Sequence, residues 1–238
     1  MSMLGAIQEL WGCARTPGPG FRARAARGPG LRGALQGLLW IRTLPTLALL
    51  ALGYLALVQG YDRARNLEGP LWSQLGARLP EGVGLADLRA ALAALPILPG
   101  LARVLPWLVL LAPAGVLSLW LHDAVWDHLA LWLLRGLAGP HSLRTTLVAD
   151  AEALQVGVFG ALAGLLPYLL GNGLLWTALL LPVALYFWIL RGFALAAWHG
   201  CPVWKGILAT LLHGLLMGVL VFGSLGLIGL LVFQQLRV

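Results

Sequence analysis

The chain has very few charged residues for its length, and it is poor in both lysine and cysteine. Of its 238 residues, 11% are charged and 60% are hydrophobic, and the mean hydropathy is +0.85. A water-soluble domain rarely has this composition. The net charge of +7 does not indicate a nucleic-acid-binding protein, because a chain this apolar is not expected to stay in water. Two cysteines, Cys13 and Cys201, are too few for a disulfide framework. The composition therefore predicts an integral membrane protein.

The longest run without an ionisable residue predicts a helical hairpin in the membrane. It extends from Leu154 to Leu190, between Glu152 and Arg191, and is nearly twice the length of about 20 residues that one span requires. Gly171-Asn172-Gly173 lies near its middle and favours a tight turn. The two arms are predicted to form the third and fourth spans, with both ends on the same side of the bilayer.

Three further uncharged runs predict the remaining spans. The first is expected over residues 43–61, the second from about residue 104 to 121, and the fifth over residues 206–233. The fold class predicted by this pattern is all-α: a polytopic membrane bundle of five transmembrane helices.

Two segments outside the spans differ in composition. Residues 1–42 carry six Arg with many Gly and Pro, which predicts a flexible cytoplasmic arm without regular structure. Residues 62–103 contain acids and Arg and are expected to form an extracytoplasmic loop. Within this loop, four leucines recur at helical spacing and predict an amphipathic helix on the membrane surface: Leu85, Leu88, Leu92 and Leu95.

The distribution of basic residues predicts the orientation. Five spans place the termini on opposite sides, and the side that holds the N-terminal arm, residues 135–153 and residues 191–205 carries more Arg and Lys. By the positive-inside rule, this side and the N-terminus are cytoplasmic. Fifteen Arg against one Lys suggest a GC-rich genome and hence the cytoplasmic (inner) membrane of a bacterium.

Several features after residue 128 come in a characteristic order. His128 precedes the run LALWLLRGLAG, which ends in a Gly break, and HSLRTTL precedes the third span. The Pro-containing hairpin follows, and His199 then opens the polar turn in WHGCPVWKGILATLL. In this order, residues 104–238, and most clearly those from about 128 onward, resemble the Yip family of Ypt/Rab-interacting membrane proteins, which also has bacterial relatives.

The resemblance implies a five-helix fold with a cytoplasmic N-terminus and no catalytic chemistry. In eukaryotic members it implies a role in vesicle traffic through small GTPases, a partner that would not transfer to a bacterium. Asp150 and Glu152 depart from the aromatic or neutral residues of bacterial relatives, and residues 1–103 show no match. The resemblance thus favours a non-enzymatic scaffold or adaptor in the membrane.

We expect such a scaffold to act through its cytoplasmic face. Its partner would be an unknown membrane or cytoplasmic protein, a second copy of the chain, or anionic lipid headgroups, and not a nucleic acid. The candidate contact residues on this face are Arg135, Arg144, Arg191, His199 and Lys205.

A small transporter or channel is the alternative, and it would use His213 with the Asp123 and Asp127 region. An ionisable residue in the middle of a span is a functional candidate, although a neutral His213 hydrogen-bonded to another helix is also compatible with the sequence. A transporter should show several polar groups facing one another at the depth of the bilayer centre. In the sequence, only His213 is expected that deep.

A metal site is the other possibility at the second span. His122, Asp123, Asp127 and His128 are all potential ligands. However, His122 and Asp127 point away from His128 on a helix, so we expect no metal there, only polar residues at a helix end near the headgroups. The sequence contains no HExxH, GxSxG, P-loop or CxxC motif. We therefore expect no catalytic residue and no cofactor.

Small residues predict close helix packing in two spans. Gly160 and Gly164 lie on one face of the third span, and Gly214 and Gly218 form a GxxxG motif in the fifth. We expect these two faces to contact each other.

Overall fold

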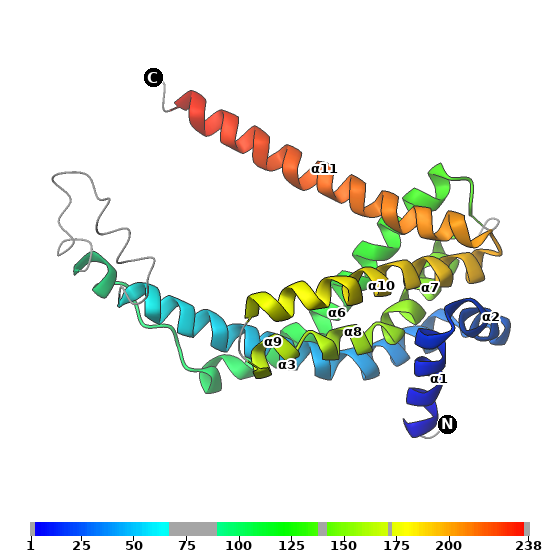
Figure 1. Cartoon of the computed structure of the whole chain (residues 1–238), viewed down its shortest axis with the longest axis horizontal. Helices are drawn as coiled ribbons and strands as arrows, with labels where there is room; N and C mark the ends of the chain where they lie inside the picture. The colour runs from blue at the N-terminus through cyan, green and yellow to red at the C-terminus, as the bar shows by residue number, and fades with distance from the viewer. Residues whose placement is uncertain (1–2, 67–89, 138–141, 171–172, 236–238) are drawn as a thin grey trace.

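The computed structural model describes residues 3–66, 90–137, 142–170 and 173–235, and these ranges contain helices and no strand (Figure 1). The all-α prediction is confirmed. The helices in chain order are α1 (Met3–Arg15), α2 (Pro17–Arg27), α3 (Leu31–Arg65), α6 (Leu101–Leu133), α7 (Ser142–Val156), α8 (Val158–Ala163), α9 (Leu166–Leu170), α10 (Gly173–His199) and α11 (Val203–Gln235).

Four of these helices are long and apolar enough to cross a membrane: α3, α6, residues 180–199 of α10 and residues 203–226 of α11. A fifth crossing results if α7 and the bent continuation through α8 and α9 form one span, with a bend of about 40°. Figure 1 shows the long helices running in alternating directions, with the two chain termini at opposite ends. The four to five candidate spans support the prediction of a multi-pass membrane protein.

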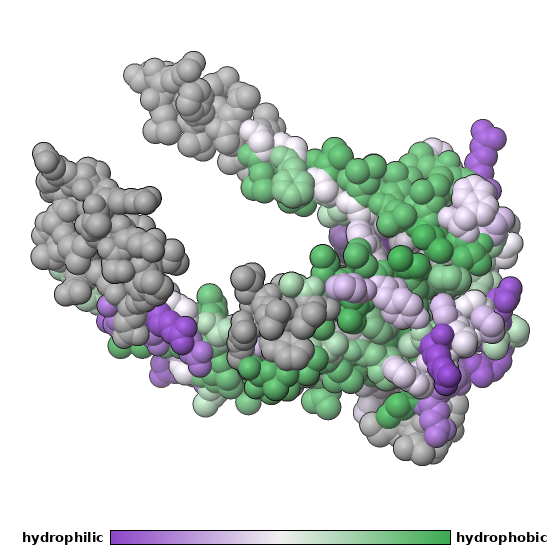
Figure 2. Space-filling view, in the orientation of Figure 1, coloured by the Kyte–Doolittle hydropathy of each residue, from purple (hydrophilic) through white to green (hydrophobic). Residues whose placement is uncertain are grey.

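The visible surface of the long helices is mostly apolar (Figure 2). Several charged side chains, in contrast, are buried inside the bundle. Trp40, Trp107 and Phe222 are 86%, 66% and 75% exposed, while Asp127 and Asp150 are both 0% exposed. This is the reverse of the distribution in a soluble protein. It is the distribution expected of a protein whose outer solvent is lipid.

The predicted flexible arm is wrong, because residues 17–27 form α2 and pack on α10. Pro17 occupies the first turn of α2, where its missing N–H removes no hydrogen bond. Gly20 is required by close packing against α1, since a Cβ there would lie 2.8 Å from the Cα of Cys13. Phe21 is completely buried. The burial of this one aromatic ring and the contacts of Arg24 hold a segment whose Gly, Pro and Arg content predicts no structure.

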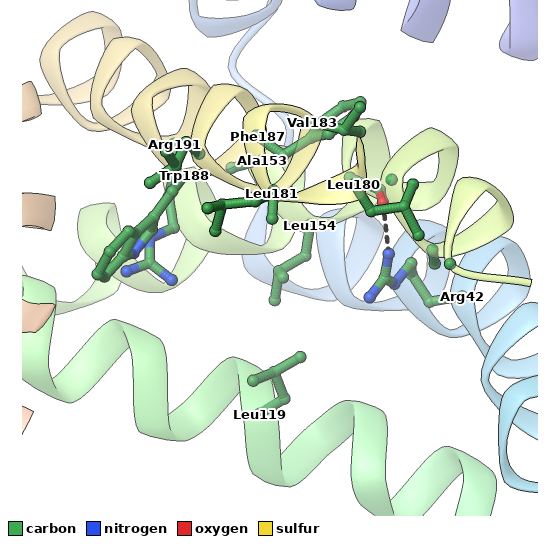
Figure 3. A pocket seen from close by; sticks show the side chains of 16 residues that line it. Arg42, Leu119, Ala153, Leu154, Leu180, Leu181, Val183, Phe187, Trp188 and Arg191 are labelled. Atoms are coloured by element: carbon green, nitrogen blue, oxygen red, sulfur yellow. Dashed lines mark hydrogen bonds between the residues drawn. The ribbon is translucent and has the colours of Figure 1, made fainter. Parts of the chain in front are cut away.

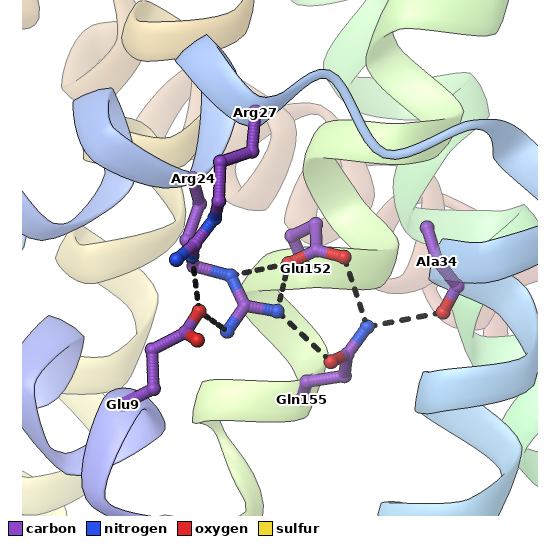
Figure 4. Close-up of polar contacts among 6 residues, drawn as sticks. All are labelled: Glu9, Arg24, Arg27, Ala34, Glu152 and Gln155. Atoms are coloured by element: carbon purple, nitrogen blue, oxygen red, sulfur yellow. Dashed lines mark hydrogen bonds and ion pairs between the residues drawn. The ribbon is translucent and has the colours of Figure 1, made fainter. Parts of the chain in front are cut away.

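Arg24 ties the N-terminal helices to α7 (Figure 4). Its guanidinium pairs with Glu9 of α1 at 2.8 Å and with Glu152 of α7, and it donates a hydrogen bond of 3.1 Å to Gln155. Gln155 in turn donates to the carbonyl oxygen of Ala34 in α3 at 3.0 Å. This network was not predicted from the sequence, because Glu152 and Gln155 lie more than a hundred residues from Arg24 and Ala34.

We expect Arg24→Gln to release α1 and α2 from the bundle, since Glu152 would then be buried without its charge partner. Limited trypsin digestion of the purified protein should cut after Arg27 and Arg32 several times faster than in the wild type. Arg22→Gln is the matched control, because Arg22 is exposed and its loss also removes one trypsin site. Equal digestion rates of the two variants would contradict the docking role of Arg24.

The first span is longer than predicted, and the loop after it is held against it. The helix begins at Leu31 and not at Thr43, so Arg42 lies inside it. Tyr54 and Tyr61 donate hydrogen bonds to the carbonyl oxygens of Pro99 and Pro96, at 2.6 and 2.7 Å. The predicted amphipathic helix falls mostly outside the described residues, and only residues 90–93 of it are described as helical.

The predicted third span is broken into α7, α8 and α9. The first break is at Gly157, and the second lies between Ala163 and Leu166. Glycine is a poor helix former. Pro167 has no N–H and its ring would clash with the carbonyl of residue 163, so α9 begins where Pro167 falls within its first turn. Pro182, in contrast, lies within an α10 that the structure describes as one continuous helix.

The close packing predicted for the glycine face of the third span is present at Gly160, but its partner there is α10 and not the fifth span. A Cβ on Gly160 would lie 2.8 Å from the Phe187 ring of α10, and one on Gly164 would lie 3.7 Å from Leu49 of α3. Gly214 contacts the Trp188 ring of α10, whereas the Cβ position of Gly218 has no described neighbour within 4 Å. Both glycine faces therefore pack against other helices, chiefly α10, and not against each other.

The closest helix crossing involves two glycines that the sequence analysis did not single out. A Cβ on Gly192 of α10 would lie 2.6 Å from the Cα of Ile207, and one on Gly206 of α11 would lie 2.1 Å from the carbonyl oxygen of Gly192. Only glycine at both positions lets the two backbones approach this closely. The crossing fixes α11 against α10 directly beside Arg191.

Candidate functional site

The helix α7 is enclosed by other helices and carries polar side chains into the interior. It contacts α1, α3, α6 and α10. Nearly all of its residues from Thr146 to Val156 are buried, including Asp150, Glu152 and Gln155. A buried helix is normally apolar on every side. The polar residues of α7 therefore indicate interior networks.

One network brings together five ionisable side chains from four helices, and we call it the buried charge cluster. Its members are Asp123 and Asp127 of α6, Asp150 of α7, Arg191 of α10 and His213 of α11. Each of the five is less than 9% exposed.

Arg191 is at the centre of the buried charge cluster. Its Nη1 lies 2.5 Å from Oδ2 of Asp123, and its Nε lies 2.8 Å from Oδ2 of Asp127. Nδ1 of His213 lies 2.7 Å from Oδ1 of Asp127 and 2.8 Å from Nη2 of Arg191. One guanidinium thus joins two carboxylates and an imidazole.

Asp150 is the member without a conventional partner. It is completely buried, and the polar side chain that its carboxyl group meets is another carboxyl group, that of Asp127, and not an N–H donor. The charges that act on it are those of Asp127, Arg191 and Asp123. A buried carboxyl group without a donor is costly unless a proton or cation neutralises it.

Local sequence explains how the cluster converges. Asp123 and Asp127 are four residues apart and share one face of α6. The Gly192–Gly206 crossing brings the backbone of α11 next to Arg191, and His213 lies two turns further along α11. Trp188 covers Gly214 beside this pair. The close crossing is what allows an arginine of α10 and a histidine of α11 to reach the same carboxylate.

Asp123 and Asp127 are not exposed polar residues at a helix end, because both side chains face the interior of the bundle. Their predicted depth near the headgroups stays a prediction. His122, Asp123, Asp127 and His128 do not share one face of α6, as predicted, and His128 points toward α7. Its Nδ1 lies 3.1 Å from Oγ1 of Thr146. The missing information was that the partners of these aspartates come from α10 and α11.

Two of the five predicted contact residues are not on a surface. Arg191 belongs to the buried charge cluster, and His199 is buried with its Nε2 3.0 Å from Oγ1 of Thr146. Arg135 and Arg144 are exposed, and Lys205 donates a hydrogen bond of 2.9 Å to the carbonyl oxygen of Arg135. Arg135, Arg144 and Lys205 therefore stay candidate contact residues on the predicted face.

Three side chains lie close enough to hold a metal ion in common. Donor atoms of His122, Asp123 and His213 are all within 4.8 Å of one another. Asp123 is already paired with Arg191, and Nδ1 of His213 is already bonded to Asp127. The prediction that no metal binds in the second span stays a prediction.

An open groove of about 690 Å³ lies beside the cluster (Figure 3). It is formed between α3, α6, the broken helix α7–α8 and α10, and Arg191 and Trp188 lie at one part of its wall. Arg42 borders another part and donates a hydrogen bond of 2.6 Å to the carbonyl oxygen of Gly157, at the first helix break. Apolar side chains make up most of the remaining wall, among them Leu119, Leu154, Leu180, Leu181 and Phe187.

The sequence analysis missed Arg42, Asp150 and Glu152 as functional candidates. Arg42 was taken as the residue that ends the N-terminal arm, and the two acids only as departures from the Yip pattern. A usable signal exists for all three, since each is a charged residue inside a run long enough to be helical and adjacent to an apolar span.

Comparison with known proteins gives no match: no family model, no curated protein and no solved structure is similar to this chain.

Proposed function

We propose that this protein is a small membrane transporter that exchanges protons at the buried charge cluster. The observation that carries the proposal is the convergence of three aspartates, one arginine and one histidine inside a bundle with an apolar outer surface. Ionisable residues in this position are rare in membrane proteins, and where they occur they mark ion pathways and proton relays.

The charge of the cluster supports proton exchange. Three carboxylates face a single guanidinium, so with His213 neutral the cluster has two uncompensated negative charges. Arg42 of α3, which acts electrostatically on Asp123, and His122 of α6, 3.3 Å from that carboxylate, are the other ionisable groups next to it. Uncompensated charge in an apolar interior is unfavourable, and proton binding removes it. Asp150, whose carboxyl group faces that of Asp127 and accepts no hydrogen bond from an N–H donor among the described residues, is the carboxyl group best placed to gain and lose that proton.

The broken helix supports a transport role independently of the charges. Transporters commonly bind their substrates where a membrane helix is interrupted. Here the interruption at Gly157 lies on the wall of the groove, and Arg191 connects that groove to the buried charge cluster. Arg191 therefore borders both the groove and the titratable side chains, which supports a transport role.

The adaptor hypothesis and the resemblance to the Yip family stay predictions. The resemblance would assign contacts to a face from which Arg191 and His199 are withdrawn, so we rank the adaptor role second. A transporter of this kind makes and breaks no covalent bond in its substrate. For the orientation, we keep the charge-based proposal of a cytoplasmic N-terminus in a bacterial inner membrane.

We expect purified protein in liposomes to carry protons, and Asp150→Asn to slow this flux at least tenfold. The substitution keeps the size and neutrality of a protonated carboxyl group but cannot release a proton. The measurement is the fluorescence of a pH-sensitive dye trapped in the liposomes after a membrane potential is imposed with potassium and valinomycin.

Asp62→Asn is the matched control, because Asp62 lies at the far end of α3, away from the cluster. Melting curves in detergent should show that both variants are folded. Flux no faster than in empty liposomes, or unchanged in Asp150→Asn, would overturn the proposal. The adaptor role would replace it if photocrosslinkers at Ser142 and Val203 trap one recurring protein in cells.

A further inference from the structure

The groove beside the cluster has the character of a lipid-chain site. Its wall is apolar apart from two guanidinium groups, and it opens among candidate membrane spans, where the surrounding solvent is the acyl chains of lipids. Figure 3 shows Arg42 and Arg191 on opposite sides of the apolar side chains that line it. An occupant must therefore be a mainly apolar molecule.

The two arginines differ in how well their charges are balanced. Arg191 is paired with Asp123 and Asp127. None of the ion pairs in the described ranges involves Arg42, whose recorded hydrogen bond is to a neutral carbonyl oxygen. Asp123 interacts electrostatically with Arg42, but its carboxylate is already paired with Arg191. The groove consequently has a cation at its edge that an anionic ligand would complement.

The groove is large enough for one acyl chain. At about 30 Å³ for each non-hydrogen atom, the roughly 18 to 20 such atoms of a long-chain fatty acid occupy about 600 Å³ or less, against about 690 Å³ in the groove. Because the groove is open, its volume does not exclude a phospholipid, and the competition experiment below distinguishes the two.

We propose that the groove binds a long-chain fatty acid anion, with its carboxylate on Arg42 and its chain along the apolar wall formed by α6, α8 and α10. The claim that this fatty acid is the cargo of the transporter rests on the proposed function. The claim that it binds in the groove does not, because binding is measured without a proton gradient. The carboxylate accepts hydrogen bonds from the guanidinium at the helix break, and the chain lies along the apolar side chains of the wall.

The test is binding of radiolabelled palmitate to the purified full-length protein in nanodiscs of phosphatidylcholine, at a pH where palmitate is ionised. Arg42→Gln should weaken palmitate binding at least tenfold and leave competition by hexadecanol unchanged, since only the anion uses the guanidinium. Arg42→Lys should retain part of the affinity. Arg63→Gln, an exposed cation at the end of the same helix, should bind like the wild type.

A second pair of variants tests the path of the chain. Leu119→Trp places a bulky ring into the groove from α6 and should abolish binding of both palmitate and hexadecanol. Leu111→Trp is the control, because Leu111 is 55% exposed on the same helix and does not line the groove. Melting curves establish that each variant is folded.

Three results would overturn the inference: no palmitate binding by the wild type, palmitate binding unaffected by Arg42→Gln, or competition by phosphatidylglycerol as strong as by palmitate. The last would assign the groove to a membrane phospholipid. If palmitate fails to bind while Asp150-dependent proton flux persists, only the fatty acid is excluded. If palmitate binds and no proton flux is found, the binding site stands and the proposed function fails.

Discussion

Replacing Arg191 with methionine should lower the free energy of unfolding by roughly 3–5 kcal/mol, which is the usual cost of removing one partner from a buried ion pair. The substitution removes the guanidinium that pairs with Asp123 and Asp127, and it leaves both carboxylates buried. The expected result is a large drop of the melting temperature in detergent, measured by tryptophan fluorescence, or loss of folded protein on expression.

Arg144→Met is the control, because Arg144 is exposed and a surface change usually alters stability by no more than about 0.5 kcal/mol. If the loss comes from uncompensated charge, the double variant Arg191→Met with Asp127→Asn should regain part of the stability. Arg191→Lys should be more stable than Arg191→Met but less stable than the wild type, since an ammonium group cannot bridge two carboxylates in the manner of a guanidinium. Wild-type stability of Arg191→Met would show that the cluster is not an ion-pair network.

Gly206→Leu should be the second most damaging change, because it forces α10 and α11 apart at their closest point. The added Cβ alone would lie 2.1 Å from a backbone oxygen of Gly192, so no rotation of a side chain can relieve the clash. Overpacking in well-packed interiors commonly costs about 1–3 kcal/mol, and a clash with backbone is expected at or above the upper end. Melting curves of the purified variant give the measurement.

Gly218→Leu is the matched control on the same helix, since the Cβ position of Gly218 has no described neighbour within 4 Å. Its melting temperature should stay close to that of the wild type. The two variants distinguish packing at the GxxxG motif from the Gly192–Gly206 crossing, because Gly218 belongs to the motif and Gly206 does not. Equal tolerance of leucine at both positions would contradict the Gly192–Gly206 crossing.

The two predictions concern the same place in the molecule. Arg191 and Gly192 are neighbours in sequence, so the residue that permits the crossing lies beside the residue that centres the cluster. Separating α10 from α11 should therefore also weaken the contact between Arg191 and His213. In a residual folded fraction of Gly206→Leu, we expect proton flux to be reduced as well.

The sequence alone determined the class of the molecule. Sixty per cent hydrophobic residues and four long uncharged runs leave no soluble alternative, since transfer of apolar surface to lipid is additive over residues and needs no knowledge of the fold. Local composition also located the apolar centres of the long helices, although not their ends, since α3 begins at Leu31 and α6 extends to Leu133. What failed locally was the N-terminal arm, whose helix depends on Phe21 and Arg24 finding partners in α10 and α7.

The tertiary structure decided which side chains meet. A membrane helix is apolar on all sides, so its sequence contains no amphipathic pattern to indicate which face turns inward or toward which neighbour. The sequence therefore placed Arg191 on a surface, apart from Asp123 and Asp127, whereas the fold brings its guanidinium within 3 Å of both carboxylates inside the bundle. Asp127 and its partner His213 are 86 residues apart in the sequence. Only the crossing of α10 and α11 at two glycines, a contact between backbones, brings those distant charges to one site.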